Sequence, residues 1–291
     1  MLLGILEQGL IYGILALGLL ITYRILDFPD LTVDSSFPLG AAVSAVLTLS
    51  GVPAWLTLIC GMLAGALAGL VTGLIHVKCK VRDLLSGIIT MTGLYSLNLR
   101  IAGKSNLPIF GSQTLFKNTF TKSLPDPIGD YSTLIIVLII CLAAKLLLDM
   151  FLKTKAGYLL RAAGDNASVV TTLSRDQGSV KIIGLMIANA LVALAGAVLC
   201  QEQRFFDISM GTGTMVIGLA SVIIGTNLFK RLTFMKSTTM VIIGSIIYKG
   251  CVSVAISCGL EATDMKLITA ALFLAILVLS NTKRKKVRIH A

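Results

Sequence analysis

Residues 53–76 read Pro-Ala-Trp-Leu-Thr-Leu-Ile-Cys-Gly-Met-Leu-Ala-Gly-Ala-Leu-Ala-Gly-Leu-Val-Thr-Gly-Leu-Ile-His, without an acidic residue, a lysine or an arginine. A transmembrane helix needs about 20 consecutive apolar residues, so this segment is long enough to cross a bilayer. Glycine recurs at every fourth position within it, as Gly61, Gly65, Gly69 and Gly73. On a helix these glycines share one face, which lets a neighbouring helix approach closely. The pattern fits packing inside the chain and packing between subunits equally well.

The composition of the whole chain extends this interpretation to the rest of the protein. Of the 291 residues, 56% are hydrophobic and 13% are charged, and the mean hydropathy is +0.91. A typical soluble domain is about half apolar and a quarter charged, and its surface needs more polar area than this chain can supply. A soluble enzyme, a secreted disulfide scaffold and a receptor with a single span are therefore excluded. The six cysteines are scattered and form no Cys-x-x-Cys pair.

Nine apolar stretches follow one another along the sequence, at about 2–23, 38–51, 53–76, 84–102, 131–152, 182–201, 213–229, 238–257 and 267–280. They predict an all-α membrane helix bundle in one domain over residues 1–291, with about nine transmembrane helices and a range of about eight to ten. The shortest stretches have two interpretations, as full spans or as re-entrant, broken helices.

The basic residues predict the orientation of this bundle. Lys and Arg gather in three connecting segments and a tail, at 78–82, 153–181, 230–236 and 282–291. Cytoplasmic loops carry an excess of these residues, and nine spans place all four sites on the same side of the membrane. We therefore expect a cytoplasmic C-terminus, an N-terminus outside and an outer loop at 103–130. The formal net charge of +11 then reflects topology, and no nucleic-acid partner is expected.

The segment Leu31-Thr-Val-Asp-Ser-Ser-Phe-Pro-Leu-Gly40 places polar side chains directly before an apolar helix, which we expect to begin near Pro38. Ser or Asp ahead of a proline at a helix start is a capping pattern. One interpretation is a plain capped cytoplasmic loop. The other is a half-helix that begins at a cavity within the membrane, a recurrent way of binding polar solutes. The second interpretation makes four residues candidates for the translocation path: Thr32, Asp34, Ser35 and Ser36.

A weakly similar arrangement occurs later in the chain. Arg204-Phe-Phe-Asp207 precedes an apolar helix after Gly213, much as Arg24-Ile-Leu-Asp27 precedes the helix near Pro38. The predicted topology puts the two segments on opposite sides of the membrane, which is what an inverted repeat would give.

The stretch 84–102 is unusually polar for a membrane helix. Exposing so much polar surface to lipid is costly, so we expect this helix to line the translocation path or the central interface. Its candidate path residues are Thr90, Thr92, Ser96 and Asn98.

Ionisable residues in the other stretches have simpler explanations. Lys145 and Asp149 lie four apart, so on a helix they can pair with each other, and we predict a structural pair near the cytoplasmic end. Glu7 and Glu202 fall near the outer ends of their helices, where they can reach water. None of these residues indicates a chain of proton carriers.

Motifs for catalysis and nucleotide binding are missing. The two histidines, His76 and His290, are far apart in the sequence and have no clustered metal ligands beside them, so no metal site is predicted. Gly103-Lys104-Ser105 looks like the end of a phosphate-binding loop but lacks the earlier glycine that such a loop requires.

The longest predicted cytoplasmic connection, 153–181, contains Arg161-Ala-Ala-Gly-Asp-Asn-Ala-Ser-Val-Val170. Gly164 can end one helix there, and Asp165 or Asn166 can cap the next. The second helix would have only about two turns, too short to be stable alone in water. We therefore expect it to be held by the bundle or by a partner protein.

This motif, Arg-x-x-Gly-x-Asn-x-x-Val-Val before a membrane span, resembles the cytoplasmic coupling segment of ATP-binding-cassette (ABC) importer permeases. The similar branch serves branched-chain amino acids, ribose and related solutes. The family pattern has two alanines where this chain has Val169 and Val170, and Gly-Ile where it has Ser174 and Arg175. Residues 30–41 and 86–101 resemble a bacterial subgroup of amino-acid permeases of the tryptophan and tyrosine type. The likeness runs over nearly the whole chain and is more specific for the family than for the solute.

The resemblance implies a type II importer fold with a division of labour. Two permease chains, expected as a homodimer, surround a central path in the bacterial cytoplasmic membrane. Two separate ATPase subunits hold ATP and magnesium and each grips one coupling helix, and an extracytoplasmic binding protein delivers the solute. This chain would then bind no cofactor and would not be an enzyme. The coupling residues that the resemblance implies are Arg161, Gly164, Asp165, Asn166, Val169 and Val170.

The solute is expected, on the resemblance alone, to be an amino acid, with an aromatic one included. A sugar or nucleoside importer is the alternative within the family. An ion-coupled secondary transporter or a channel would work without ATP. A membrane enzyme would depend on His76, which has no obvious serine partner.

Overall fold

The computed structural model describes residues 2–118, 128–165, 177–230 and 234–257, together with individual helical residues between 267 and 278. Its elements in chain order are α1 (Leu2–Leu19), the π-helix η1 (Leu20–Ile25), α2 (Val33–Leu49), α3 (Ala54–Val77), α4 (Asp83–Ala102), β1 (Asn106–Pro108), α6 (Ile128–Leu152), α7 (Lys155–Asp165), α9 (Gln177–Gln203), β2 (Phe205–Asp207), the 3-10 helix η2 (Ile208–Gly211), α10 (Thr214–Leu228) and α11 (Ser237–Ser257). The predicted all-α class is confirmed, with one short ribbon of two strands added to it.

Eight of the nine predicted apolar stretches form helices. Six segments are long and apolar enough to cross a membrane, whereas α2 has only 17 residues and α4 is too polar to be counted with them. The chain is therefore a multi-pass membrane protein. Of the ninth stretch, 267–280, the structure describes only individual residues, all helical, and the basic tail at 282–291 lies outside the described residues. The total of about nine spans stays a prediction.

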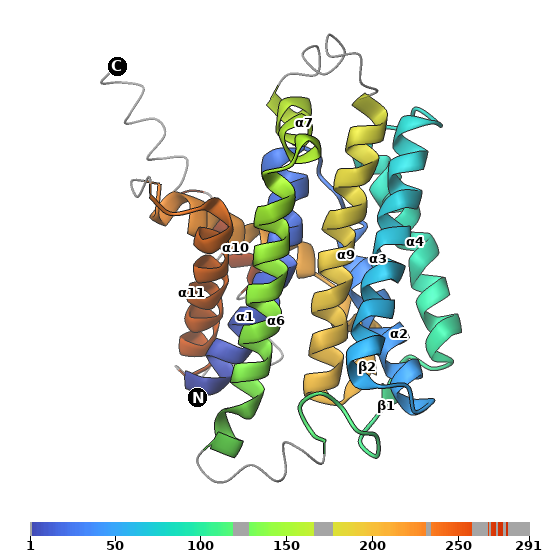
Figure 1. Cartoon of the computed structure of the whole chain (residues 1–291), viewed down its shortest axis with the longest axis vertical. Helices are drawn as coiled ribbons and strands as arrows, with labels where there is room; N and C mark the ends of the chain where they lie inside the picture. The colour runs from blue at the N-terminus through green and yellow to red at the C-terminus, as the bar shows by residue number, and fades with distance from the viewer. Residues whose placement is uncertain are drawn as a thin grey trace.

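Most of the helices run along the long axis of the molecule, with α9 near the centre and packed against α1, α2 and α3, whereas α10 lies across the bundle (Figure 1). The helix α7 lies at one end of the bundle, and the β1–β2 ribbon lies at the other (Figure 1). In that antiparallel ribbon Leu107 pairs with Phe206. We call these ends the α7 end and the ribbon end.

Residues in or next to three of the predicted cytoplasmic sites make contacts at the α7 end. His76, in the last turn of α3, has its Nε2 atom 3.5 Å from Nζ of Lys181 in the first turns of α9. Lys236, just before α11, reaches Asp149 near the end of α6. These contacts agree with the common side that the positive residues predict, and the α7 end remains the predicted cytoplasmic end.

The glycine face of α3 is buried within the chain, against α9. A Cβ atom on Gly65 would collide with the Ala193 side chain and the Asn189 carbonyl, and one on Gly69 would collide with the Leu185 carbonyl. At the ends of the same row, Gly61 and Gly73 face Ala197 and Ile182. The structure thus uses the row for internal packing, which decides between the two explanations that the sequence left open.

The opposite face of α3 carries large apolar side chains at the same spacing of four. Five exposed residues form it: Trp55, Ile59, Leu63, Leu67 and Val71. A helix with one small buried face and one large apolar exposed face suits a position at the lipid boundary.

The helix α2 begins at Val33, so the predicted start near Pro38 is wrong. Pro38 lies inside the helix, where its missing N–H cannot pair with the carbonyl of Asp34. Gly211 packs directly against that carbonyl and against the Pro38 ring. The proline is accommodated because a neighbouring backbone without a side chain fills the space beside it.

The predicted pair of Lys145 and Asp149 is present and belongs to a larger group. Lys145 Nζ lies 3.5 Å from Asp149 Oδ2, and Lys236 Nζ lies 2.9 Å from the same oxygen. Thr238 Oγ1 donates a hydrogen bond of 2.7 Å to Asp149 Oδ1. Asp149 therefore joins α6 to the beginning of α11 at the α7 end.

Replacing Asp149 with asparagine is expected to lower the stability of the purified protein by about 1–2 kcal/mol, because two ammonium groups lose their carboxylate while the Thr238 bond can persist. Thermal unfolding in detergent measures this change. The matched control is Asp27→Asn, since Asp27 is exposed and adopts a positive φ of 52° that asparagine tolerates. Equal melting temperatures for the two variants would contradict the role given to Asp149.

Candidate functional site

The first turn of α2 lies deep inside the bundle, against the middle of α9. Asn189, halfway along α9, donates a hydrogen bond of 2.7 Å from Nδ2 to Asp30 Oδ2 and accepts one of 2.7 Å at Oδ1 from Ser36 Oγ. The other carboxylate oxygen of Asp30 accepts the Thr32 N–H at 2.9 Å. All four side chains are buried. The chain therefore enters the bundle from the α7 end and begins α2 partway along it.

Asp30 is a functional candidate that the sequence interpretation missed. Its side chain is almost fully buried, and its two carboxylate oxygens accept hydrogen bonds from the Thr32 N–H and from Asn189 Nδ2. The signal was available in the sequence, since an aspartate two residues before Thr32 is the usual start of an Asx turn.

Five of the eight predicted path residues are buried around the first turns of α2 and its contact with α4: Thr32, Ser35, Ser36, Thr90 and Asn98. The hydroxyls of Thr32 and Thr72 lie 2.8 Å apart, which ties α2 to α3. Ser35 Oγ donates to the Met91 carbonyl at 2.8 Å, and Asn98 Nδ2 donates to the Ser35 carbonyl at 3.0 Å. Thr90 bonds within α4, to the Ser86 carbonyl. These groups hold α2 against its neighbours through bonds to backbone carbonyls and to Thr72, whereas the buried Oδ1 atom of Asn98 has no hydrogen-bond partner in the described structure.

Asp34 reaches across the bundle and caps a different helix. Its Oδ1 atom accepts the Met215 N–H at 2.8 Å and the Thr214 hydroxyl at 3.0 Å, and its Oδ2 atom accepts the Gly213 N–H at 3.2 Å. The N-cap residue of α10, Gly213, has no side chain and a φ of 85°. A carboxylate at a helix start satisfies free N–H groups and complements the helix dipole.

The helices α2 and α10 thus begin at the same place inside the bundle, with Asp34 between their N-termini. We call this place the helix junction and define it by Asp30, Asp34, Asn189, Gly211 and Thr214. Two helix starts facing each other within a membrane protein concentrate free N–H groups where polar or anionic groups bind well. The interpretation of residues 31–40 as a half-helix start, and not as a plain cytoplasmic loop, agrees with this geometry.

The two remaining path candidates, Thr92 and Ser96, point away from the chain. Both are exposed on α4, beside the exposed Gly93, Tyr95 and Arg100. Among the eight candidates these two alone lie on a surface that another chain or a passing solute can touch.

The two segments that the sequence compared as an inverted repeat lie toward opposite ends of the bundle. Residues 24–27 contact α7, whereas Asp207 belongs to the ribbon, where its side chain accepts the Ser209 N–H at 2.7 Å. Asp30 makes the same kind of turn, because its side chain also accepts the N–H of the residue two positions later, Thr32. Each turn of this kind stands a few residues before one of the two helices that meet at the junction.

The predicted coupling residues fall partly within the described chain. Arg161 is exposed on α7 with its guanidinium 5.9 Å from the centroid of the Tyr158 ring, and Asp165 is the last residue of α7. The other three residues, Asn166, Val169 and Val170, and the predicted second helix lie outside the described residues.

Gly164 sits directly against the C-terminal turn of the π-helix η1. A Cβ atom on Gly164 would collide with the Ile25 carbonyl oxygen, and the neighbouring Leu26 packs against Gly184 of α9. The π-helix closes with a bond from the Leu26 N–H to the Ile21 carbonyl, and the chain then runs to Asp30 in four residues. The segment that carries the predicted coupling motif therefore contacts Ile25 and Leu26, and the short stretch 26–30 leads from this contact to the helix junction.

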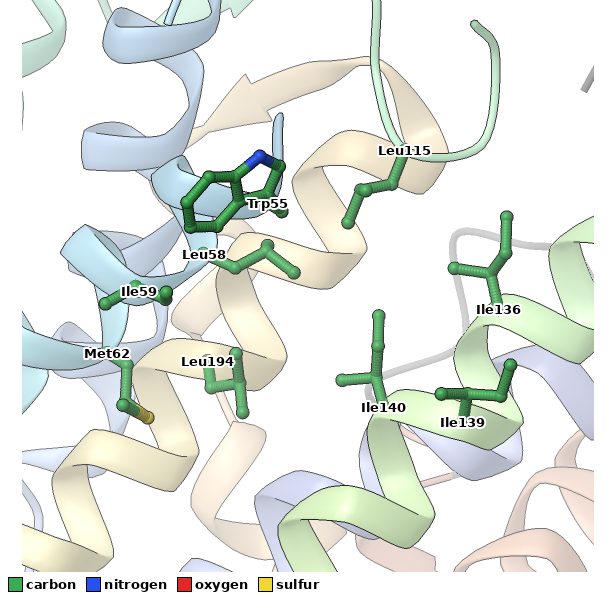
Figure 2. Close-up of a pocket in the computed structure, with 9 residues that line it drawn as sticks. All are labelled: Trp55, Leu58, Ile59, Met62, Leu115, Ile136, Ile139, Ile140 and Leu194. Carbon is green, nitrogen blue, oxygen red and sulfur yellow. The ribbon is translucent and has the colours of Figure 1, made fainter. Parts of the chain in front are cut away.

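An apolar pocket of about 380 Å³ opens between α3, α6 and α9 (Figure 2). Its lining includes Trp55, Met62, Ile139 and Leu194 and contains no charged side chain. A polar solute would lose its hydrogen bonds there, so this pocket is not the translocation site. Within the described residues no three His, Cys, Asp or Glu side chains gather closely enough to hold a metal ion.

Comparison with known proteins shows a consistent group of relatives. The model of a family described as the permease component of branched-chain amino acid transport systems matches residues 1–280. A tyrosine transport system permease protein of Clostridioides difficile is 45% identical over 96% of this chain and 90% of its own length. An uncharacterized protein of Rickettsia prowazekii is 32% identical over 96% of this chain and 97% of its own length. A ribose import permease of Bacillus subtilis is 29% identical over 77% of this chain and 67% of its own length. No solved structure matches the chain.

Proposed function

This chain belongs to the family of permease components of branched-chain amino acid transport systems, and from that premise we propose that it is the membrane subunit of an ATP-driven importer for an amino acid. The observation that carries the choice of solute is the 45% identity, over nearly the whole chain, to a permease of a tyrosine transport system. Tyrosine and other aromatic amino acids are therefore the first candidates. The ribose permease relatives, which are less similar and match a shorter part of the chain, support a sugar as the second candidate.

The coupling step is proposed to begin at α7. Separate ATPase subunits, which hold ATP and magnesium, would bind the cytoplasmic segment 153–181 through the exposed side of α7 and the residues that follow it. Because Gly164 touches the Ile25 carbonyl, a displacement of α7 would move η1 and the chain that leads to Asp30. Asp34 would carry the movement from α2 to α10 through its three hydrogen bonds. This chain supplies the moving parts and no catalytic group.

The partners proposed for the other surfaces follow from exposure. A second copy of the chain would pack on the polar face of α4 that carries Thr92, Ser96 and Arg100, with the solute passing between the copies, because such a face is costly to expose to lipid. An extracytoplasmic binding protein would dock at the ribbon end and deliver the solute. The chain would lie in the bacterial cytoplasmic membrane with its C-terminus in the cytoplasm. An ion-coupled transporter or channel would need none of these partners.

Reconstitution with the cognate ATPase and binding protein in proteoliposomes tests the proposal. Uptake of L-tyrosine is expected to require both proteins and ATP, and Gly164→Pro or deletion of 165–173 is expected to abolish it together with ATPase binding. Gly4→Ala, at a position with nothing within 4 Å of the new methyl group, is the control that keeps uptake. Normal ATP-dependent uptake after the deletion would refute the coupling role, and uptake by this chain alone along an ion gradient would refute the importer.

A further inference from the structure

Four polar and aromatic side chains from three helices gather near the ribbon end, on the approach to the helix junction. They are Gln8 and Tyr12 of α1, Glu202 in the last turn of α9, and Lys249 of α11. All four are partly exposed. We call this group the outer cluster.

The Lys249 ammonium has aromatic and neutral partners only. Its Nζ lies 3.8 Å from the centroid of the Tyr12 ring and 3.4 Å from Gln8 Oε1. No carboxylate of the described chain lies within ion-pair distance of it, since both ion pairs found there belong to Asp149. A cation held on an aromatic face with a neutral amide beside it can still accept an anion as a further partner.

The Glu202 carboxylate also lacks a hydrogen-bond partner on one of its oxygens. Its Oε2 atom is buried and has no hydrogen-bond partner in the described structure. Lys249 and Glu7 lie close enough to act on it electrostatically, but neither of them touches it. A buried carboxylate oxygen without a donor is costly, and ionisable side chains inside membrane proteins usually mark sites of solute or ion binding.

The contrast with Asp149 shows what a purely structural pair looks like in this chain. Asp149 has two ammonium groups and a hydroxyl on its two oxygens. In the outer cluster an ammonium and a carboxylate instead stand near each other without contact, so each keeps a position for a group of opposite charge.

Two stacked aromatic rings, Tyr12 and Phe37, connect the outer cluster to the first turns of α2. The Tyr12 ring stacks on the ring of Phe37 with centroids 6.1 Å apart and an angle of 16° between the planes. Phe37 lies on α2, three residues beyond Asp34. A molecule seated on Tyr12 would therefore be one helical turn from the helix junction.

We propose that the outer cluster binds the solute as a zwitterion before it enters the helix junction. The carboxylate of an α-amino acid would contact Lys249 and the Gln8 amide, its ammonium group would contact Glu202, and an aromatic side chain would lie against Tyr12. This inference rests on the proposed function and deepens it, because it assigns the solute class to residues of this chain. A sugar or nucleoside has no pair of opposite charges to satisfy both groups.

Equilibrium binding of radiolabelled L-tyrosine to the permease–ATPase complex in nanodiscs, without the binding protein, tests the assignment. The competitors are tyramine, which lacks the carboxylate, and 3-(4-hydroxyphenyl)propionate, which lacks the ammonium group. The complex is expected to bind tyrosine about tenfold or more tightly than either analogue, because each one leaves a charged group unpaired.

The variants separate binding from structure. Lys249→Met is expected to remove the preference for tyrosine over tyramine, whereas Lys249→Arg is expected to keep it. Glu202→Gln is expected to remove the preference for tyrosine over 3-(4-hydroxyphenyl)propionate. Lys104→Met, in the exposed connection after α4, is the matched control that keeps both. A structural role would weaken all three ligands equally or unfold the protein.

The affinities of the wild-type complex for tyrosine and the two analogues test the inference even where a variant does not fold. Absent tyrosine binding, equal binding of the three ligands, or variants that keep both preferences would overturn the inference. Uptake by the full system distinguishes the two proposals: ATP-dependent tyrosine uptake without discrimination by the complex refutes the outer cluster alone, whereas failure of uptake with binding protein and ATP refutes the proposed function.

Discussion

Replacing Gly69 with valine is expected to prevent this permease from reaching its native fold. The hydrogen atom of Gly69 faces the Leu185 carbonyl of α9, and even a Cβ atom there would overlap that oxygen and crowd the Met186 Cα. The colliding atoms belong to backbone, so no side-chain rotation can relieve the overlap. The two helices would have to separate along their whole contact.

The expected loss is about 3 kcal/mol or more, at or above the upper end of ordinary overpacking, because valine adds two further carbon atoms beyond Cβ. Fluorescence-detected size-exclusion chromatography after mild heating measures the folded fraction. Gly4→Val on α1 is the control, since nothing lies within 4 Å of its Cβ position. A Gly69→Val protein as stable as the control would show that α3 and α9 do not pack as described.

The sequence predicted the helices well because length and apolarity are local properties. The stretches 53–76, 84–102 and 131–152 correspond to α3, α4 and α6 to within a few residues. The start of α2 was misplaced because the proline pattern is usually found at the first helical position, whereas Pro38 is tolerated here by contact with Gly211. That contact joins residues far apart in the chain and leaves no local signal.

The site was harder to predict because the partners of polar residues are set by tertiary packing. The candidates on residues 31–40 were rightly singled out as polar, but their partners on α9 and α10 lie more than 150 residues away. On α4 the buried Thr90 and Asn98 are eight residues apart and share one helix face. The exposed Thr92 and Ser96 are four apart and share another, so this division could have been predicted from the sequence. Whether the α3 glycines pack within the chain or against another subunit could not be predicted, because the answer depends on which helix lies against that face.

The capping of α10 by Asp34 makes the second large prediction. Asp34→Ala removes the acceptor of two backbone N–H groups and of the Thr214 hydroxyl, in a place where Thr214 is almost fully buried. We expect a loss of about 2–4 kcal/mol, since the lost bonds are made to a charged group and the Gly213 and Met215 N–H groups lose this acceptor, while the Thr214 hydroxyl keeps the Gly211 carbonyl at 3.0 Å. Asp34→Asn keeps one acceptor oxygen and should lose less.

The effect on transport is expected to exceed the effect on folding. Asp34 is the side chain that joins the first turn of α2 to the start of α10, so a protein that folds without it would no longer pass movement from one helix to the other. We expect ATP-dependent uptake to fall by about tenfold or more, the factor that a coupling energy of about 1.4 kcal/mol represents. Faster hydrogen–deuterium exchange at residues 213–217, with uptake measured on the same preparation, tests both parts.

The matched control for Asp34 is Asp83→Ala at the start of α4. Asp83 also accepts a backbone N–H, that of Leu84 at 2.9 Å, but this exposed bond lies within the first turn of its own helix. It should therefore lower stability by no more than about 1 kcal/mol and leave uptake unchanged. Equal loss of uptake in the two variants would show that Asp34 acts only by stabilising a helix start and not by coupling α2 to α10. Loss confined to Asp34→Ala would place the coupling between α2 and α10 in this one carboxylate.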